Sequence, residues 1–143
     1  MVRVEDDIHI DVDPETAFEY MDVPEHQAEI SPSLSTVETV EQLPSGGKRA
    51  AYTYRMGGIS LDGEVKAVTY DPPERIVFEM TGGIDGTVEW TFTPEGDGVR
   101  VGYAAEYDLP TPVLDRLAAP FVRKYNEREL ATTLRNLKTR LEV

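Results

Sequence analysis

The residues of this 143-residue chain that could do chemistry are aromatic, and they recur at alternate positions. Four tyrosines and the only tryptophan share this parity: Tyr52 and Tyr54, then Trp90, then Tyr103 and Tyr107. Alternate residues of a strand lie on one face, so we expect these rings to point inward together. A buried phenol or indole N–H needs a hydrogen-bond partner, whereas Leu, Ile and Val fill a plain core without one. As a set, the rings favour a partly polar pocket; any single tyrosine could instead reach the rim and bond backbone or water.

Histidine, arginine and cysteine offer weaker candidates for chemistry. His9 alternates with Ile8 and Ile10, and Arg55 follows an inward tyrosine, so both are expected to point outward; His26 is expected at the surface. The chain has no Cys, which excludes disulfides, thiolate zinc sites and cysteine nucleophiles. We expect neither a metal nor a cofactor.

Charge limits the partners that the chain can bind. The 27 acidic and 14 basic residues give a net charge of −13, which repels nucleic acid and anionic membranes. This acidic, lysine-poor composition is similar to that of proteins from salt-loving microbes. The chain has no apolar run of about 18 residues and no secretory leader, so we expect a cytoplasmic protein without membrane insertion.

The elements that must position the aromatic residues can be predicted from residue periodicity. Even spacing of apolar residues predicts a first strand over residues 2–12, and Asp13 followed by Pro14 predicts a helix start. One short helix is expected from this start to Tyr20 or Met21, and a second over residues 24–30. Six further strands follow, divided by Gly and Pro turns: residues 36–43, 49–56, 59–70, 75–81, 86–93 and 99–109.

The end of the chain changes to helical spacing. Leu130, Leu134, Leu137 and Leu141 form one stripe, and a second stripe precedes it on a different face. We expect Pro120 to kink this helix or to start a new one. The length and this element order predict one domain over residues 1–143, of the α+β class: a curved seven-stranded antiparallel sheet wrapped around a long C-terminal helix. A ferredoxin-like sandwich is the alternative, although it wants a second long helix in mid-chain.

Three segments resemble motifs of one family in their order along the chain. They are residues 8–18 (IHIDVDPETAF), residues 65–76 (VKAVTYDPPERI) and residues 134–142 (LRNLKTRLE). They are similar to the first strand and helix, a hairpin and the helix end of the START-related helix-grip (SRPBCC) superfamily. Within it the chain is nearest the polyketide cyclase/dehydrase and lipid transport branch, with some likeness to the accessory-subunit type found with carbon monoxide dehydrogenase.

The resemblance implies a cavity between the sheet and the C-terminal helix, which we expect to measure roughly 300 to 1,000 Å³. Strand parity and the helical stripe predict its wall: Tyr52, Tyr54, Met56, Phe78, Met80, Trp90, Phe92, Tyr103, Tyr107, Leu117, Phe121 and Tyr125. The implied function is binding or transport of a hydrophobic small molecule, lipid-like or polyketide-like.

The sequence leaves two alternative functions open. One is a cyclase or dehydratase without cofactor, since polyketide cyclases of this fold polarise carbonyls with donors inside an apolar cavity. The other is an accessory module with a protein partner, or a homodimer. The bases of the C-terminal segment are expected to form a solvated face, or otherwise a partner surface: Arg116, Arg123, Lys124, Arg128, Arg135, Lys138 and Arg140.

Overall fold

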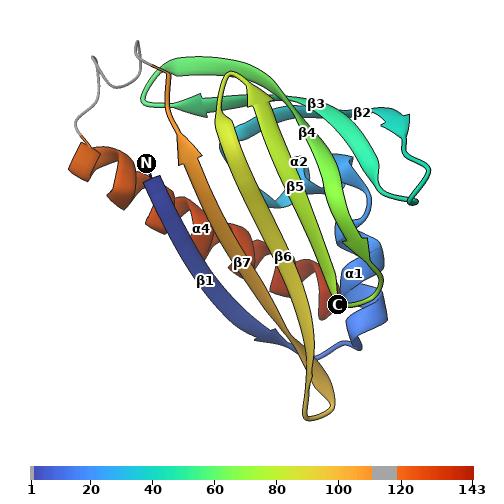
Figure 1. Ribbon diagram of the computed structural model, residues 1–143. Helices are drawn as coiled ribbons and strands as arrows, with labels where there is room; N and C mark the ends of the chain where they lie inside the picture. The colour runs from blue at the N-terminus through green and yellow to red at the C-terminus, as the bar shows by residue number, and fades with distance from the viewer. Residues whose placement is uncertain (1, 111–118) are drawn as a thin grey trace.

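The computed structural model describes residues 2–110 and 119–143 (Figure 1). The strands are β1 (Val2–Ile10), β2 (Leu34–Gln42), β3 (Lys48–Met56), β4 (Ile59–Asp71), β5 (Arg75–Gly82), β6 (Asp85–Glu95) and β7 (Gly98–Asp108). The helices are α1 (Pro14–Met21), α2 (Pro24–Ile30) and α4 (Ala119–Leu141). Each expected strand and helix in the described ranges is present, and the strand boundaries lie close to those expected.

The strands form one antiparallel sheet in the order β1-β7-β6-β5-β4-β3-β2. Strands β2 to β7 follow one another as a meander, and β1 joins the far edge by pairing with β7, from Val2 opposite Tyr107 to Ile10 opposite Val99. The sheet curves around α4 (Figure 1). The helix-grip expectation is therefore confirmed and the ferredoxin-like alternative is wrong.

The helices begin where local chemistry predicts. The Asp13 carboxylate accepts a hydrogen bond from the Thr16 N–H at 2.8 Å, and Pro14 occupies the first position of α1, where it has no N–H to leave unpaired. Pro120 lies in the first turn of the described α4, and the residues before Ala119, on which the expectation of a kink depends, lie outside the described residues. None of the helices in the described ranges is long and apolar enough to span a membrane.

One side of the core is solidly filled. Phe18 of α1 packs on Phe92 of β6 and on Tyr70 of β4, with ring centroids 5.4 and 5.6 Å apart. The Tyr70 hydroxyl donates to the Asp22 carboxylate at 2.8 Å, and Lys48 pairs with the same carboxylate at 3.0 Å. We call this region, defined by Phe18, Tyr70 and Phe92, the closed end.

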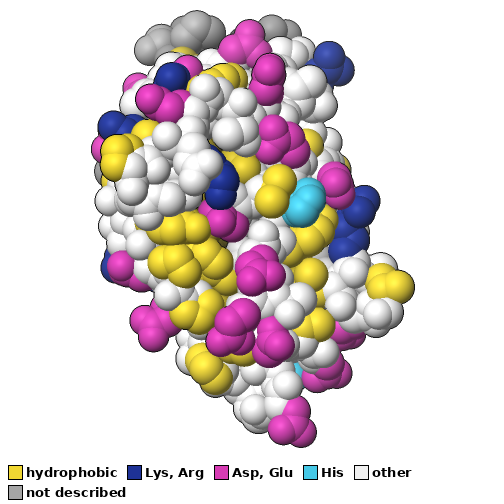
Figure 2. Space-filling model, turned by 90° about the vertical axis from the view of Figure 1, so that its right-hand side faces the viewer, with side chains coloured by type: hydrophobic (Ala, Val, Ile, Leu, Met, Phe, Trp, Pro, Cys, Tyr) yellow, Lys and Arg dark blue, Asp and Glu magenta, His cyan; other side chains and the backbone are white. Residues whose placement is uncertain are grey.

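Along α4, the buried residues Val122, Leu130, Leu134 and Leu137 face the sheet, and the helix packs along β1. On the opposite edge the sheet meets α2, which lies against β2. Figure 2 shows the face of the molecule on which β2 and the short helices lie, with acidic side chains spread over it and hydrophobic side chains between them. In the described ranges, α1, α2 and α4 thus lie over the inner face of the sheet, and the site lies among them.

Candidate ligand-binding site

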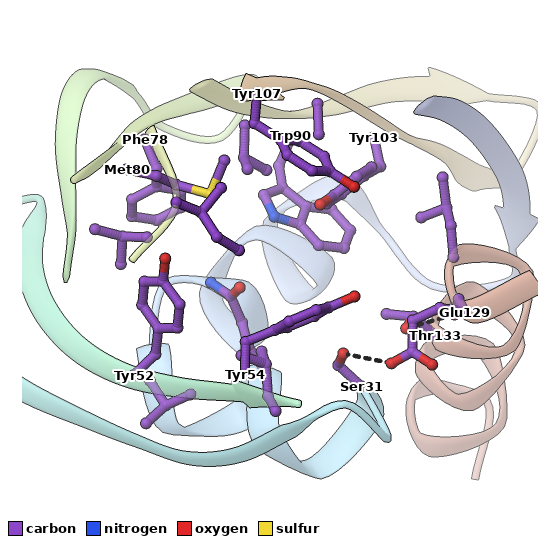
Figure 3. Close-up of a pocket in the computed structure, with 18 of the residues that line it drawn as sticks. Ser31, Tyr52, Tyr54, Phe78, Met80, Trp90, Tyr103, Tyr107, Glu129 and Thr133 are labelled. Atoms are coloured by element: carbon purple, nitrogen blue, oxygen red, sulfur yellow. Dashed lines mark hydrogen bonds between the residues drawn. The ribbon is translucent and has the colours of Figure 1, made fainter. Parts of the chain in front are cut away.

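A cavity of about 130 Å³ lies between the inner face of the sheet and the helices α2 and α4 (Figure 3). Strands β3, β5, β6 and β7 supply its aromatic wall, and α2 contributes Pro24, Gln27 and Ile30. The cavity is smaller than the volume we expected from the sequence. It exceeds the space that one water needs several-fold and is close to an engineered cavity of about 150 Å³ that takes up benzene.

Seven of the twelve residues predicted for the wall line this cavity. They are Tyr52, Tyr54, Phe78, Met80, Trp90, Tyr103 and Tyr107. All seven come from the inward positions of strands, where alternation assigns the face directly. Figure 3 shows their side chains around one space.

Of the other five predicted residues, the four that the structure describes do not line the cavity. Met56 and Phe92 are fully buried but do not line the cavity, and Phe92 belongs to the closed end. Phe121 is 47% exposed and stacks on Tyr125, with centroids 6.1 Å apart. Leu117 lies outside the described residues. Strand parity gives the face that a residue occupies but not its depth along the sheet, and α4 turns a different stripe toward the cavity.

The face of α4 that borders the cavity carries polar residues that we did not predict from the sequence. Asn126, Glu129 and Thr133 of α4 line the cavity together with Leu130. A signal was present, because Asn126, Leu130, Thr133 and Leu137 recur at intervals of four, three and four, which places them on one helical face. Asn126 and Thr133 are each only 6% exposed. The helix therefore presents a buried polar row to the tyrosines of the sheet.

Asn126 connects two of these tyrosines. The Tyr54 hydroxyl donates to Asn126 Oδ1 at 3.2 Å, and Asn126 Nδ2 donates to the Tyr107 hydroxyl. The Asn126 amide on α4 thus links β3 to β7 by hydrogen bonds to one phenol on each strand.

Glu129 ties α4 to the segment between α2 and β2. Its Oε1 accepts hydrogen bonds from Ser31 Oγ at 3.1 Å and from the Ser33 N–H at 2.7 Å. Nearby, Ser33 Oγ lies 2.6 Å from the hydroxyl of Tyr125, which donates to the Arg55 carbonyl at 3.2 Å. Glu129 is the one charged side chain that lines the cavity in the described part of the chain.

Two donors of the wall find no partner among the residues that the structure describes. The Tyr52 hydroxyl and the Trp90 indole N–H are buried and make no hydrogen bond with any described residue. Tyr52 is 7% and Trp90 is 2% exposed. The Trp90 ring is instead held by an edge-to-face contact with Tyr103, at a centroid distance of 4.9 Å.

Burial keeps the phenols of the cavity protonated. Desolvation, with a smaller effect of Asp85, raises the pKa of Tyr52 to about 12. Desolvation and then the nearby Glu129 carboxylate raise the pKa of Tyr103 to about 12. Burial also raises the pKa values of Tyr54 and Tyr107 well above their usual range. At neutral pH these groups therefore offer hydrogen bonds and do not act as bases.

The histidines and Arg55 lie away from the cavity lining. His9 contacts two carboxylates, Glu95 at 2.7 Å and Asp11 at 2.9 Å, and His26 Nδ1 lies 2.7 Å from the Tyr20 carbonyl. Arg55 is exposed. Among the described residues, no three His, Asp or Glu side chains gather in a way that could hold a metal ion.

Comparison with known proteins identifies one family for this chain. The sequence profile of the family described as polyketide cyclase/dehydrase and lipid transport matches residues 1–142. No curated protein sequence matches the chain significantly.

Solved structures share the architecture at low sequence identity. A protein from Thermus thermophilus is similar over 97% of this chain and 96% of its own, with a TM-score of 0.85 and 21% identity. The Zhui aromatase/cyclase from a Streptomyces species matches over 98% and 93% of the two chains, with a TM-score of 0.82 and 15% identity. A START superfamily protein from Mycobacterium smegmatis matches over 98% and 97%, with a TM-score of 0.82 and 14% identity. At these identities the likeness shows the fold alone.

Proposed function

Since the chain belongs to the polyketide cyclase/dehydrase and lipid transport family, we propose that it binds a hydrophobic small molecule in the cavity between the sheet, α2 and α4. The observation that carries this proposal is the cavity itself, a largely apolar and aromatic space between the sheet and the helices. Side chains that line such a space lack packing partners on one side. A hydrophobic ligand supplies these contacts and removes its own apolar surface from water.

The volume sets the size of what enters. A cavity of about 130 Å³ accommodates roughly one aromatic ring or a short alkyl chain. A longer lipid-like or polyketide-like molecule places one such portion inside and the rest beyond the present wall. Native mass spectrometry of the protein from its source cells would identify the natural ligand by mass.

Filling the cavity tests the proposal directly. Val65 of β4 lines the cavity, whereas Val68 of the same strand is 52% exposed. We expect Val65→Phe to weaken binding of a single-ring probe such as α-methylstyrene at least about tenfold, because the new ring occupies the space. Val68→Phe is the matched control and should bind like the unmodified protein in calorimetric titration. Equal binding by both variants, or no binding by the unmodified protein, would contradict the proposal.

A second candidate function is a cyclase or dehydratase reaction without cofactor, and Glu129 favours it. One oxygen of this carboxylate is held by Ser31 and Ser33, and the side chain lines a cavity that also contains protonated phenols. A carboxylate can take a proton from the carbon beside a ketone while phenols donate hydrogen bonds to the enolate oxygen. Such a step is common to cyclisation and dehydration of keto compounds.

Hydrogen exchange separates catalysis from binding. If Glu129 acts as a base, the protein should accelerate exchange of the methyl hydrogens of acetophenone with D₂O, measured by NMR. Glu129→Gln should abolish the acceleration, and Glu127→Gln, at an exposed position of the same helix, should keep it. Binding without accelerated exchange would leave binding as the function and remove the enzymatic alternative.

A further inference from the structure

The unpaired donors of the cavity wall carry an inference about which ligand fits. Buried polar groups are nearly always hydrogen-bonded, so two unpaired donors on one cavity are unusual. The Tyr52 hydroxyl belongs to β3 and the Trp90 N–H to β6, and both side chains line the same space (Figure 3). A molecule bound in this space, a water or a ligand, can supply the missing acceptor.

The chemistry of the two groups specifies the partner atom. An indole N–H donates and cannot accept. The Tyr54 hydroxyl already donates to Asn126 Oδ1, so its proton is not offered to a ligand, and the Tyr107 hydroxyl accepts from Asn126 Nδ2. A ligand that satisfies Trp90 and Tyr52 therefore needs an acceptor, such as a carbonyl or ether oxygen.

The charge of the lining disfavours anions. No Lys or Arg lines the cavity in the part of the chain that the structure describes, and the single charged lining residue there is the Glu129 carboxylate. A ligand carboxylate would enter an apolar space without a counter-ion and beside a like charge, both of which disfavour the ionised form. The net charge of the protein, −13, adds to this repulsion at long range.

We infer that the cavity selects a neutral, single-ring compound that bears a hydrogen-bond acceptor, with Tyr52 and Trp90 as the specificity-determining donors, and that it discriminates against carboxylates. This inference rests on the proposed ligand-binding function and deepens it. It separates fatty-acid-like ligands, which carry a charged head, from ketone-like or ether-like ligands, which do not.

Three probes of nearly equal shape test the inference by calorimetric titration. Acetophenone presents a carbonyl oxygen, α-methylstyrene replaces that oxygen with a methylene, and benzoate carries the charge. We expect Tyr52→Phe to weaken acetophenone binding about five- to tenfold and to change α-methylstyrene binding less than twofold, because only acetophenone loses a hydrogen bond. Benzoate should bind at least about tenfold more weakly than acetophenone, and Glu129→Gln should narrow that gap.

The chain offers a matched control for Tyr52→Phe. The Tyr20 hydroxyl is also buried, but Tyr20 does not line the cavity, so Tyr20→Phe should leave the binding of every probe unchanged. If Tyr52→Phe weakens the binding of acetophenone and α-methylstyrene equally, or weakens the binding of neither probe, the cavity does not select for an acceptor. The proposed binding function would still stand. Benzoate binding as tight as that of acetophenone would overturn the discrimination by charge. If none of the three probes binds, the proposed function fails with the inference.

Discussion

The two ends of the sheet contain similar aromatic residues, but the residues differ in their packing and hydrogen bonding. At the closed end, the Tyr70 hydroxyl is paired with Asp22, and Phe92 packs on Phe18. At the cavity end, the Tyr52 hydroxyl has no partner within residues 2–110 and 119–143, and Phe78 borders the cavity. The difference comes from α1, which covers one end of the sheet, whereas the other end is faced by the polar row of α4. Aromatic residues on the inner face are therefore a binding surface only where no helix side chain fills the space before them.

The largest expected effect tests this comparison through packing. Phe92→Ala at the closed end should lower the free energy of unfolding by roughly 3 to 5 kcal/mol, because the ring is fully buried and packs on Phe18. Phe78→Ala should cost about 1 to 2 kcal/mol less, since one side of its ring already lacks contacts. Urea denaturation of both variants measures the difference. Equal losses would mean that the two ends are packed alike.

A smaller effect is expected from the polar bridge at the cavity end. Asn126→Ala leaves the hydroxyls of Tyr54 and Tyr107 without their shared partner, at a cost of about 1 to 3 kcal/mol in unfolding free energy. Adding Tyr54→Phe to Asn126→Ala should recover part of this loss, because it removes one of the stranded hydroxyls. A double variant less stable than Asn126→Ala alone would show that the bridge contributes little.

The smallest expected effect comes from a charged contact beyond the closed end. Hydrogen bonds to Asp11 and Glu95 raise the pKa of His9 above 6.5, so the folded state favours the protonated ring. The resulting stabilisation is fully present below the unfolded pKa of about 6.5 and is lost as the pH rises through the folded pKa. The melting temperatures of the unmodified protein and His9→Gln should differ at pH 5.5 and converge at alkaline pH. A difference in melting temperature that does not change with pH would show that the contact does not depend on protonation of His9.

Local rules made most of the fold predictable. Asp13 and Pro14 predict the start of α1, and the turn residues divide the strands, because caps and turns depend on near neighbours. The candidate site was predictable only where it lies on strands. Phe92 has the expected parity, but its depth is set by Phe18, which comes from a distant part of the chain. The rotation of α4, which buries Asn126 and leaves Phe121 exposed, depends likewise on tertiary packing.

The pairing of β1 with β7 has a consequence for how the protein folds. Val2 lies opposite Tyr107, so among the described strands the first one pairs with β7 alone, after nearly three quarters of the chain has been made. Contacts this distant in sequence close late and slow folding, because the loop-closure entropy must be overcome before they form. The meander from β2 to β7 can assemble from neighbouring segments first. During synthesis β1 is therefore an unpaired edge for longer than any other strand, and its charged residues Glu5, Asp6 and Asp7 oppose pairing with another chain in that interval.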